Sequence, residues 1–478
     1  MSLAVRRGLL VLVGVLLLQS AWMVAVPPFR GSDEFDHAFR AAGVATGQWH
    51  LSEAAHDGRG QLVWVPVGLA EAASAQCASL PYTGPDNCHP VEVRDGRALV
   101  ATAAGPYNPA YYWLIGTVAR PFHGSSALYA MRVTTALVCA LLLALGAGLL
   151  TRARAGRWTT LGLVAALMPE VIYSSVVAAP DGPEMALGLV LWGGLLAATG
   201  RDGPARSGWP LALAGAAATV LAFLRQLGPL WLAVIMVSAI AYQGLPAVRE
   251  VVAQRRRVVL ASVCAVFVAG CWWAVWQLIA AHVHTPADAV PQSPESHKWI
   301  LAFNLPAWIP QMIGVFPYRN QPIPLYFYPL ALLVICGFLV AARRVSRGTR
   351  DRRVVGGVVL ASLVIPVAAS VALMPAYGAI WQGRYELVFV IGILPLCGLV
   401  LDRHAFAPGE ADRLTLTALA CLAVVQVASV VVVMHRELGR TVSTEHSGWV
   451  HPPLVVVAAL ALAGFGVLSR VAWEARDG

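Results

Sequence analysis

Charged residues are scarce in this sequence. Only 12% of its 478 residues are Asp, Glu, Lys or Arg, whereas soluble domains carry about 25%. Hydrophobic residues make up 58%, and the mean hydropathy is +0.67. This composition excludes an ordinary soluble protein and predicts an all-α polytopic membrane protein.

Lysine is almost missing, because Lys298 is the only one. The net charge of +9 comes from arginines that are spread over short loops between apolar segments. This distribution is typical of membrane topology and differs from the concentrated patch of a nucleic-acid-binding surface. We therefore expect membrane lipid, and no nucleic acid, as a partner.

Cysteine pairs with the spacing of a metal site are also missing, since no CxxC occurs. Six of the eight cysteines lie in apolar segments, where cysteine behaves as a small hydrophobe. Cys77 and Cys88 lie in a polar stretch instead, and there they could form a disulfide on an oxidising side of the membrane.

Long apolar runs predict about twelve membrane-spanning helices in a single domain, 1–478. The first run, from about Gly8 to Val26, follows Arg6 and Arg7 and is read as an uncleaved span. The others lie at about 126–150, 158–178, 183–200, 209–226, 227–245, 257–281, 323–342, 354–374, 384–402, 413–434 and 453–471. With the N-terminus inside, the arginine-rich loops fall on one side, so both termini are expected in the cytoplasm of a plasma-membrane protein.

Two long connections interrupt the apolar pattern, and long connections are often functional. Residues 28–125 form the first extracytoplasmic loop, in which we expect amphipathic helices and the candidate catalytic acids. Residues 282–322 form a second large extracytoplasmic loop with a surface helix around 299–313. No internal repeat is visible, which disfavours a transporter built from duplicated halves.

The acidic stretch after the first span is the leading candidate for chemistry. Ser32 is a good N-cap, and a helix from there places Asp33, Asp36 and His37 on one face. Glu34 lies a quarter-turn away. We expect a surface helix that turns its acids toward a cavity. The alternative is that the acids only complement the helix dipole.

Polar residues at predicted outer helix ends complete the candidate set, because such groups are costly in a membrane. They are Arg132, Glu170, Asp181, Glu184, Arg225, Arg384 and Tyr385, together with Tyr111 and Tyr112 in an aromatic run. Structural alternatives stand beside them. Asp181 and Glu184 have the spacing of a capping box, Arg384 could pair with Glu386, and the two tyrosines could be interfacial anchors.

The order of these motifs resembles the GT-C superfamily, multi-spanning glycosyltransferases that use polyprenyl-phosphate sugars. It resembles more closely the DUF2142 family of predicted membrane proteins. The family's Pro-Pro-Asp-Glu-x-x-His is echoed by Asp33-Glu34-Phe35-Asp36-His37, its Pro-Asp by Pro180-Asp181, and its Gln-Gly-Arg-Tyr is matched by Gln382-Gly383-Arg384-Tyr385. Two departures are the four residues between Pro28 and Asp33, and Ala179 where Asn is common.

The resemblance implies a glycosyltransferase, of the inverting type, that moves a sugar from a polyprenyl-phosphate donor to a glycan, lipid or protein acceptor of the cell envelope. Asp33 would be the base, with Glu34 or Asp36 as substitutes and His37 orienting the acid. Arg384, with Arg225 or Arg132, would hold the phosphate; Tyr385 and Asp181 would bind substrate, and Tyr111 and Tyr112 would line the acceptor side. A divalent metal is left open as a cofactor. A flippase or transporter of lipid-linked glycans and a non-catalytic assembly subunit are the alternatives.

Overall fold

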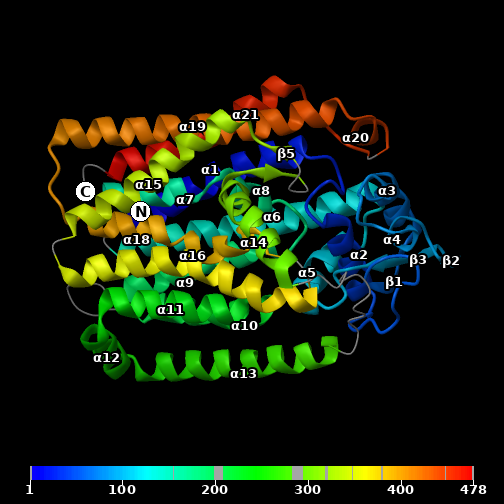
Figure 1. Ribbon diagram of the computed structural model, residues 1–478, viewed down its shortest axis with the longest axis horizontal. Coiled ribbons are helices and arrows are strands. Elements are labelled where there is room, and N and C mark those ends of the chain that lie inside the picture. Colours follow the sequence, from blue (N-terminus) through cyan, green and yellow to red (C-terminus); the bar gives the residue numbers. More distant parts are fainter. Residues whose placement is uncertain are drawn as a thin grey trace.

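Long helices lie side by side along one axis of the molecule, and a smaller helix-and-strand segment covers one end of them (Figure 1). The computed structural model describes residues 3–153, 156–198, 208–281, 294–317, 321–346, 348–377, 381–446 and 448–475. The first helix begins, and the last helix ends, at the opposite end of the bundle (Figure 1). We call the end that carries the small segment the site end.

A helix, or a pair of shorter helices, occupies each of the twelve apolar segments. The unbroken ones are α1 (Leu3–Ala25), α6 (Gly124–Arg152), α9 (Asp181–Ala198), α10 (Trp209–Leu224), α11 (Gly228–Gln243), α13 (Arg256–Ala281), α15 (Tyr328–Val345), α16 (Thr349–Tyr377), α19 (Pro408–Leu438) and α21 (Leu454–Glu474). The paired ones are α7 (Arg157–Ala166) with α8 (Pro169–Ser174), and α17 (Leu387–Val390) with α18 (Ile393–Leu401).

Length and composition support a multi-pass membrane protein. Within the described ranges, eight helices are long and apolar enough to cross a membrane by themselves. The number becomes nine if α11 and α12 (Leu245–Gln254), which meet at a bend of 104°, count as one span. The twelve-span topology therefore stays a prediction, while the mostly helical membrane fold is confirmed.

Proline explains the break in the predicted span 158–178. Pro169 occupies the first position of α8, where its missing N–H is tolerated, and it pushes Met168 into an extended conformation. Every residue of the two short helices except Arg157 is buried. A broken segment of this kind is tolerated at membrane depth only where protein surrounds it.

The acidic helix differs from its prediction in two ways. It is α2 (Glu34–Ala45), and its N-cap is Asp33, in a left-handed conformation with φ 54° and no side-chain capping bond. Ser32 was wrongly expected to cap it; the Ser32 hydroxyl donates to the carbonyl of Pro317 instead. The surface location was also wrong, because residues 34–44 are all buried. Helix α2 packs between α5 (Pro109–Ala119) and a small sheet.

That sheet is the part of the chain that the all-α expectation missed. Its strands are β1 (Gln61–Pro66), β2 (Glu92–Arg94) and β3 (Arg97–Thr102), antiparallel in the order β1-β3-β2. The signal was present in the sequence, because Asp95-Gly96 is a typical two-residue hairpin turn, and both residues have positive φ. Helices α3 (Val67–Ala78) and α4 (Pro85–Cys88) lie beside the sheet and are joined by a Cys77–Cys88 disulfide.

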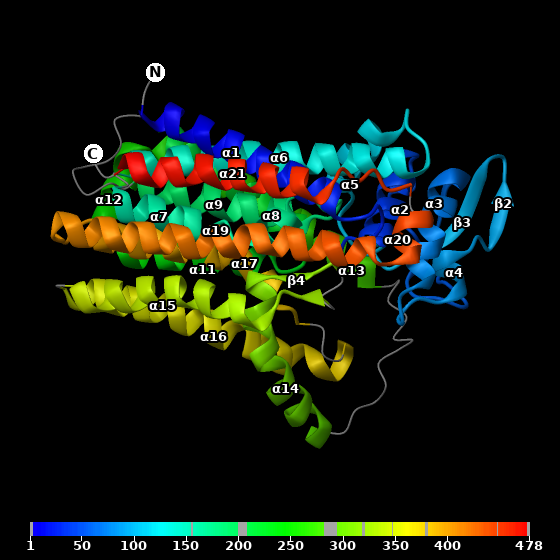
Figure 2. The ribbon, with the colours of Figure 1, turned by 90° about the horizontal axis from the view of Figure 1, so that it is seen from above.

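The second long connection contains the expected surface helix. Helix α14 (Pro294–Ile313) projects away from the bundle (Figure 2), and its Trp299 and Phe303 side chains are exposed. Residues 282–293 lie outside the described part of the chain. Short elements complete the fold: β4 (Val315–Phe316), β5 (Gln321–Pro322), η1 (Leu325–Phe327), η2 (Gly383–Glu386) and α20 (Thr441–Glu445).

Candidate functional site

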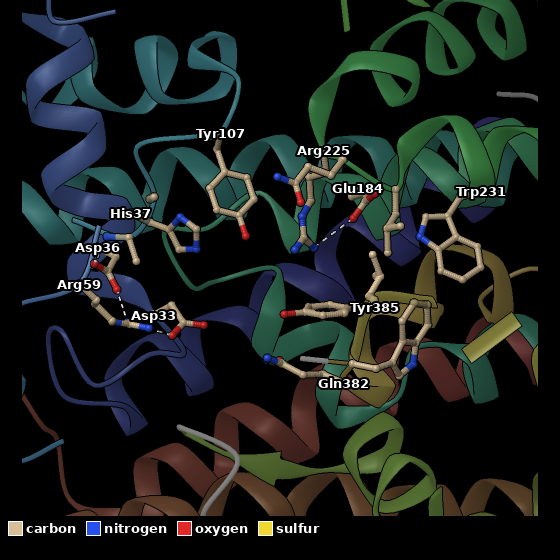
Figure 3. A pocket seen from close by; sticks show the side chains of 16 residues that line it. Asp33, Asp36, His37, Arg59, Tyr107, Glu184, Arg225, Trp231, Gln382 and Tyr385 are labelled. Carbon is tan, nitrogen blue, oxygen red and sulfur yellow. Dashed lines mark hydrogen bonds and ion pairs between the residues drawn. The ribbon is translucent and has the colours of Figure 1, made fainter. Parts of the chain in front are cut away.

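A cavity of about 430 Å³ opens at the site end of the bundle. Its walls come from the start of α2, the end of β3, the start of α9, the turn between α10 and α11, and the segment before α17. Figure 3 shows the acids of α2 on one side, Trp231 on the other, and Tyr385 between them. Segments that are far apart in the sequence therefore meet around one polar space.

Asp33 is the most accessible carboxylate of this cavity. Its side chain is 25% exposed, against 3% for Asp36 and 2% for Glu184. Arg384 Nη2 donates to Asp33 Oδ2 at 3.2 Å, and Arg59 Nη2 lies 3.7 Å from Asp33 Oδ1. The left-handed conformation, which suits Asp better than most residues, gives Asp33 its orientation at the head of α2.

Asp36 lies behind Asp33 and is held on both oxygens. Arg59 Nη2 donates to Oδ2 at 2.5 Å, and the amide of Ala103 donates to Oδ1 at 2.7 Å. Burial alone would lower the pKa of Arg59, but the charges of Asp36 and Asp33 outweigh it and raise that pKa. Asp36 therefore positions Arg59 at the cavity wall. No sequence motif pointed to Arg59, since it follows a polar turn before β1.

Arg225 is the second guanidinium of the wall. Its Nη1 donates to Asp181 Oδ1 at 2.5 Å and to Glu184 Oε2 at 3.2 Å. Its charged carbon lies 5.0 Å from the ring centre of Tyr385 and 5.9 Å from that of Tyr107, within cation–π distance. Asp181 and Glu184 thus belong to an ion-pair network. Their carboxylates bind Arg225, and not the backbone amides of a capping box as their spacing had suggested.

Arg384 lies directly behind the cavity wall. Its side chain is 6% exposed, and its Nε is 3.9 Å from Asp181 Oδ1. Because Asp33 and Asp181 are its partners, the alternative pairing with Glu386 is not the one that the structure shows. Arg384 and Arg225 share Asp181, so the Gln-Gly-Arg-Tyr motif and the start of α9 form one charged layer.

His37 lines the cavity as a neutral group. Burial lowers its pKa to about 4, Arg225 and Arg384 act in the same direction, and Asp33 and Asp181 oppose them. Its Nδ1 lies 2.8 Å from the hydroxyl of Tyr112. A neutral imidazole fixed in this way can donate or accept one hydrogen bond at its other nitrogen.

Several predicted site residues lie outside the cavity wall; besides Arg384 and Asp181, they include Glu34, Arg132, Tyr111 and Tyr112. Tyr112 supports His37, and the hydroxyl of Tyr111 is 2.8 Å from Thr135 Oγ1. Arg132 grips Glu34 with two bonds of 2.8 and 2.6 Å and also donates to the carbonyls of Val26 and Pro27. Glu34 and Arg132 are fully buried, so together they lock the end of α1 to the start of α2.

Glu34→Gln is expected to destabilise the fold, because it leaves the buried guanidinium of Arg132 with a neutral partner. Breaking one side of a buried ion pair costs about 3–5 kcal/mol. Denaturant unfolding of the purified protein in detergent measures this, with the exposed Glu53→Gln as the matched control. Equal midpoints for the two variants would show that Arg132 does not depend on Glu34.

Aromatic and amide side chains form the remainder of the wall, among them Tyr107, Trp231, Trp381 and Gln382. Two of these residues belong to motifs that the sequence analysis had identified. Tyr107 belongs to the aromatic run before α5, and Gln382 opens the Gln-Gly-Arg-Tyr motif. Trp231 carried no signal, since a tryptophan in an apolar helix is ordinary.

A metal site would need carboxylates that are available to ligate. Asp33, Asp36, Asp181 and Glu184 all contact guanidinium groups here. Across the ranges that the structure describes, no group of three or more His, Cys, Asp or Glu residues is arranged to hold a metal ion.

A family model establishes the family to which the chain belongs. The model of the predicted membrane proteins DUF2142 matches residues 16–393, from α1 through the start of α18. The chain belongs to the DUF2142 family. The resemblance drawn from the acidic, Pro-Asp and Gln-Gly-Arg-Tyr motifs is confirmed, because the matched range contains all three.

Two crystal structures of ArnT from Cupriavidus metallidurans are similar to this chain, one bound to undecaprenyl phosphate and one in the apo state. They are 16% and 15% identical to it. Each comparison has a TM-score of 0.44 and covers 97% of this chain and 76% of the other. No curated protein matches the chain.

Proposed function

We propose that this DUF2142 protein is a membrane glycosyltransferase that transfers a sugar from a polyprenyl-phosphate donor to an acceptor of the cell envelope. The observation that carries the proposal is one cavity in which an accessible carboxylate, Asp33, faces the guanidinium layer of Arg225 and Arg384. A base and an anion-binding group side by side are what transfer from a sugar phosphate requires.

Asp33 acts as the base in this proposal. An acceptor hydroxyl gives its proton to the Asp33 carboxylate while its oxygen forms a bond to the anomeric carbon. The bond between that carbon and the phosphate oxygen breaks, and its electron pair leaves on the phosphate. Attack from the face opposite the phosphate inverts the anomeric configuration.

Arg225 receives the leaving phosphate, supported by Arg384. A guanidinium offers several donors in a plane and can grip two phosphate oxygens. Arg225 lines the cavity beside Trp231, Trp381 and Leu227, so the lipid-like part of the donor has an apolar wall next to the charged one. The acids that now occupy Arg225 keep it ionised and correctly placed before the donor arrives.

The proposal places the site end at the outer face of the plasma membrane. The opposite end carries the arginine clusters, including Arg343, Arg344, Arg352, Arg353 and Arg403, and the positive-inside rule assigns that end to the cytoplasm. The Cys77–Cys88 disulfide at the site end agrees with this orientation, because disulfides persist on the oxidising side.

A deletion strain tests the proposed reaction. Loss of the protein is expected to remove one sugar from an envelope glycan and to raise the amount of the matching polyprenyl-phosphate sugar in lipid extracts, both measured by mass spectrometry. Complementation with the wild-type chain should reverse both changes. Accumulation of a whole lipid-linked oligosaccharide would instead indicate a flippase. An unchanged lipid pool would indicate a non-catalytic assembly subunit.

Transfer is expected to weaken in acid through Asp36. Burial raises the pKa of the Asp36 carboxyl to about 6, although Arg59 and the Ala103 amide oppose the shift. Above that pH the carboxylate holds Arg59 in place, and below it the charge is lost. His37, with its pKa near 4, stays neutral through this range.

The pH profile of kcat/KM for the donor checks this expectation. The rate should fall as the pH drops through about 6 in the wild type, and Asp36→Asn should be slow at every pH and lack that limb. An unchanged acid limb in Asp36→Asn would assign the limb to a different group.

A further inference from the structure

A second cavity lies at the end of the bundle opposite the candidate site. It is a groove of about 340 Å³ between the end of α15, the end of α18 and the start of α19, with Trp158 of α7 at its floor. Its size falls within the roughly 300–1,000 Å³ of small-molecule pockets. We propose that it binds an acyl chain of an anionic phospholipid whose phosphate contacts Arg344 and Arg413.

The lining explains why the occupant is a hydrocarbon chain. Apart from Thr417, the described residues of the lining are apolar, and Trp158, Phe338 and Phe406 form an aromatic floor. The ring centres of Trp158 and Phe406 are 4.9 Å apart, and those of Trp158 and Phe338 are 6.4 Å apart. Among the residues that the structure describes, no charged side chain lines the groove, so a polar ligand would have few hydrogen-bond partners there.

The groove exists because the side chains that face each other across it are small. Gly337 and Ala341 on α15 face Ala418 on α19. A Cβ atom added at Gly337 would meet no heavy atom within 4 Å, so open space lies directly over this glycine. Small residues normally let two membrane helices close together, and here they leave a channel instead.

The position of the groove selects the source of that chain. Leu333 and Leu414 in its lining are 60% and 46% exposed, on the outer surface of a bundle whose apolar spans face lipid. The bilayer therefore supplies an acyl chain at the mouth of the groove. The groove is independent of the proposed transfer reaction, because the reaction cavity lies at the other end of the bundle.

Two exposed arginines select the headgroup. Arg344 follows Ala341 by three residues and Gly337 by seven, so it lies on the groove face of α15 one turn beyond the lining. Arg413 precedes Thr417 by four residues on α19 and lies at the same end. A phosphate between them would be neutralised at the membrane surface, as basic pockets between helices do for anionic lipids.

Alkylation of Cys421 provides the test, because this free cysteine lines the groove. The full-length protein in detergent is titrated with phosphatidylglycerol or with phosphatidylcholine of the same chains, and the reaction of each cysteine with N-ethylmaleimide is followed by peptide mass spectrometry. At ten times its Kd, phosphatidylglycerol should slow Cys421 about tenfold. Cys264, exposed on α13, should keep its rate.

Two sets of variants separate the chain site from the headgroup site. Arg344→Gln with Arg413→Gln should reduce the protection by phosphatidylglycerol to that by phosphatidylcholine. Gly337→Trp should fill the groove and abolish the co-purified phospholipid seen by native mass spectrometry, while Gly270→Trp on α13, where an added Cβ also meets nothing within 4 Å, should retain it.

Equal slowing of Cys421 and Cys264 by both lipids would mean that only bulk lipid surrounds the helices, and the proposal would fail. Retained phospholipid in Gly337→Trp would overturn it as well. If phosphatidylglycerol protected Cys421 equally well in the wild type and in the double arginine variant, the headgroup assignment would be refuted.

Discussion

Asp33→Asn is expected to lower sugar transfer by about a hundredfold or more, the usual cost of losing a general base, while the protein stays folded. Asparagine keeps the shape of the side chain and tolerates the left-handed conformation that Asp33 adopts, so the head of α2 should keep its geometry. What disappears is the carboxylate that accepts the acceptor's proton. Turnover of a polyprenyl-phosphate sugar by the purified variant in lipid nanodiscs measures the loss.

Asp95→Asn is the matched control for this substitution. Asp95 also has a positive φ and also lies beside an arginine, but it is exposed in the β2–β3 hairpin turn, far from the cavity wall. It should transfer at the wild-type rate. A folded Asp33→Asn protein that matched Asp95→Asn in turnover would remove Asp33 from the reaction and leave it a purely structural partner of Arg384 and Arg59.

Local patterns in the sequence predicted the features that depend on neighbours in the chain. Apolar runs located the helices, because each must bury its own backbone hydrogen bonds in lipid. The turn at Arg225, the acidic start of α2 and the Gln-Gly-Arg-Tyr segment were placed near one another because each follows or precedes a span on the same side.

Partners across the chain could not be predicted in this way. Glu34 pairs with Arg132, 98 residues away, and Asp33 with Arg384, 351 residues away. Nothing local distinguishes Glu34, which saturates a buried arginine, from Asp33, which faces the cavity. The pairing is a consequence of how α6 and the segment before α17 pack against α2, and that packing is set by the whole bundle.

The burial of α2 escaped prediction for a related reason. Its composition is that of an amphipathic surface helix, but α5, α3 and the small sheet pack against it and bury it. Arg59, just before β1, and the amide of Ala103, just after β3, supply partners for Asp36, so its carboxylate becomes acceptable in the interior. A helix assigned to the surface from its own sequence is thus a wall of the cavity.

Arg225→Gln is expected to lower transfer by about a hundredfold or more, because it removes the guanidinium aimed at the leaving phosphate. Arg225→Lys should recover only part of the rate, since an ammonium keeps the charge but cannot grip two phosphate oxygens in a plane. Both variants are assayed for kcat and for the KM of the donor, and the affinity for free polyprenyl phosphate is measured by titration. We expect that affinity to fall in the same order as the rate.

Arg225 also holds Asp181 and Glu184, so its loss would unbalance two buried acids even if it never touched a substrate. The double variant Arg225→Gln with Glu184→Gln separates the two roles, because it removes one negative charge together with the positive one. If Arg225 only neutralises the acids, the double variant should regain both stability and transfer. If it binds the phosphate, the double variant should regain stability while transfer and affinity for polyprenyl phosphate stay as low as in Arg225→Gln. We expect the second result, and recovery of transfer in the double variant would contradict the assignment of Arg225 to the phosphate.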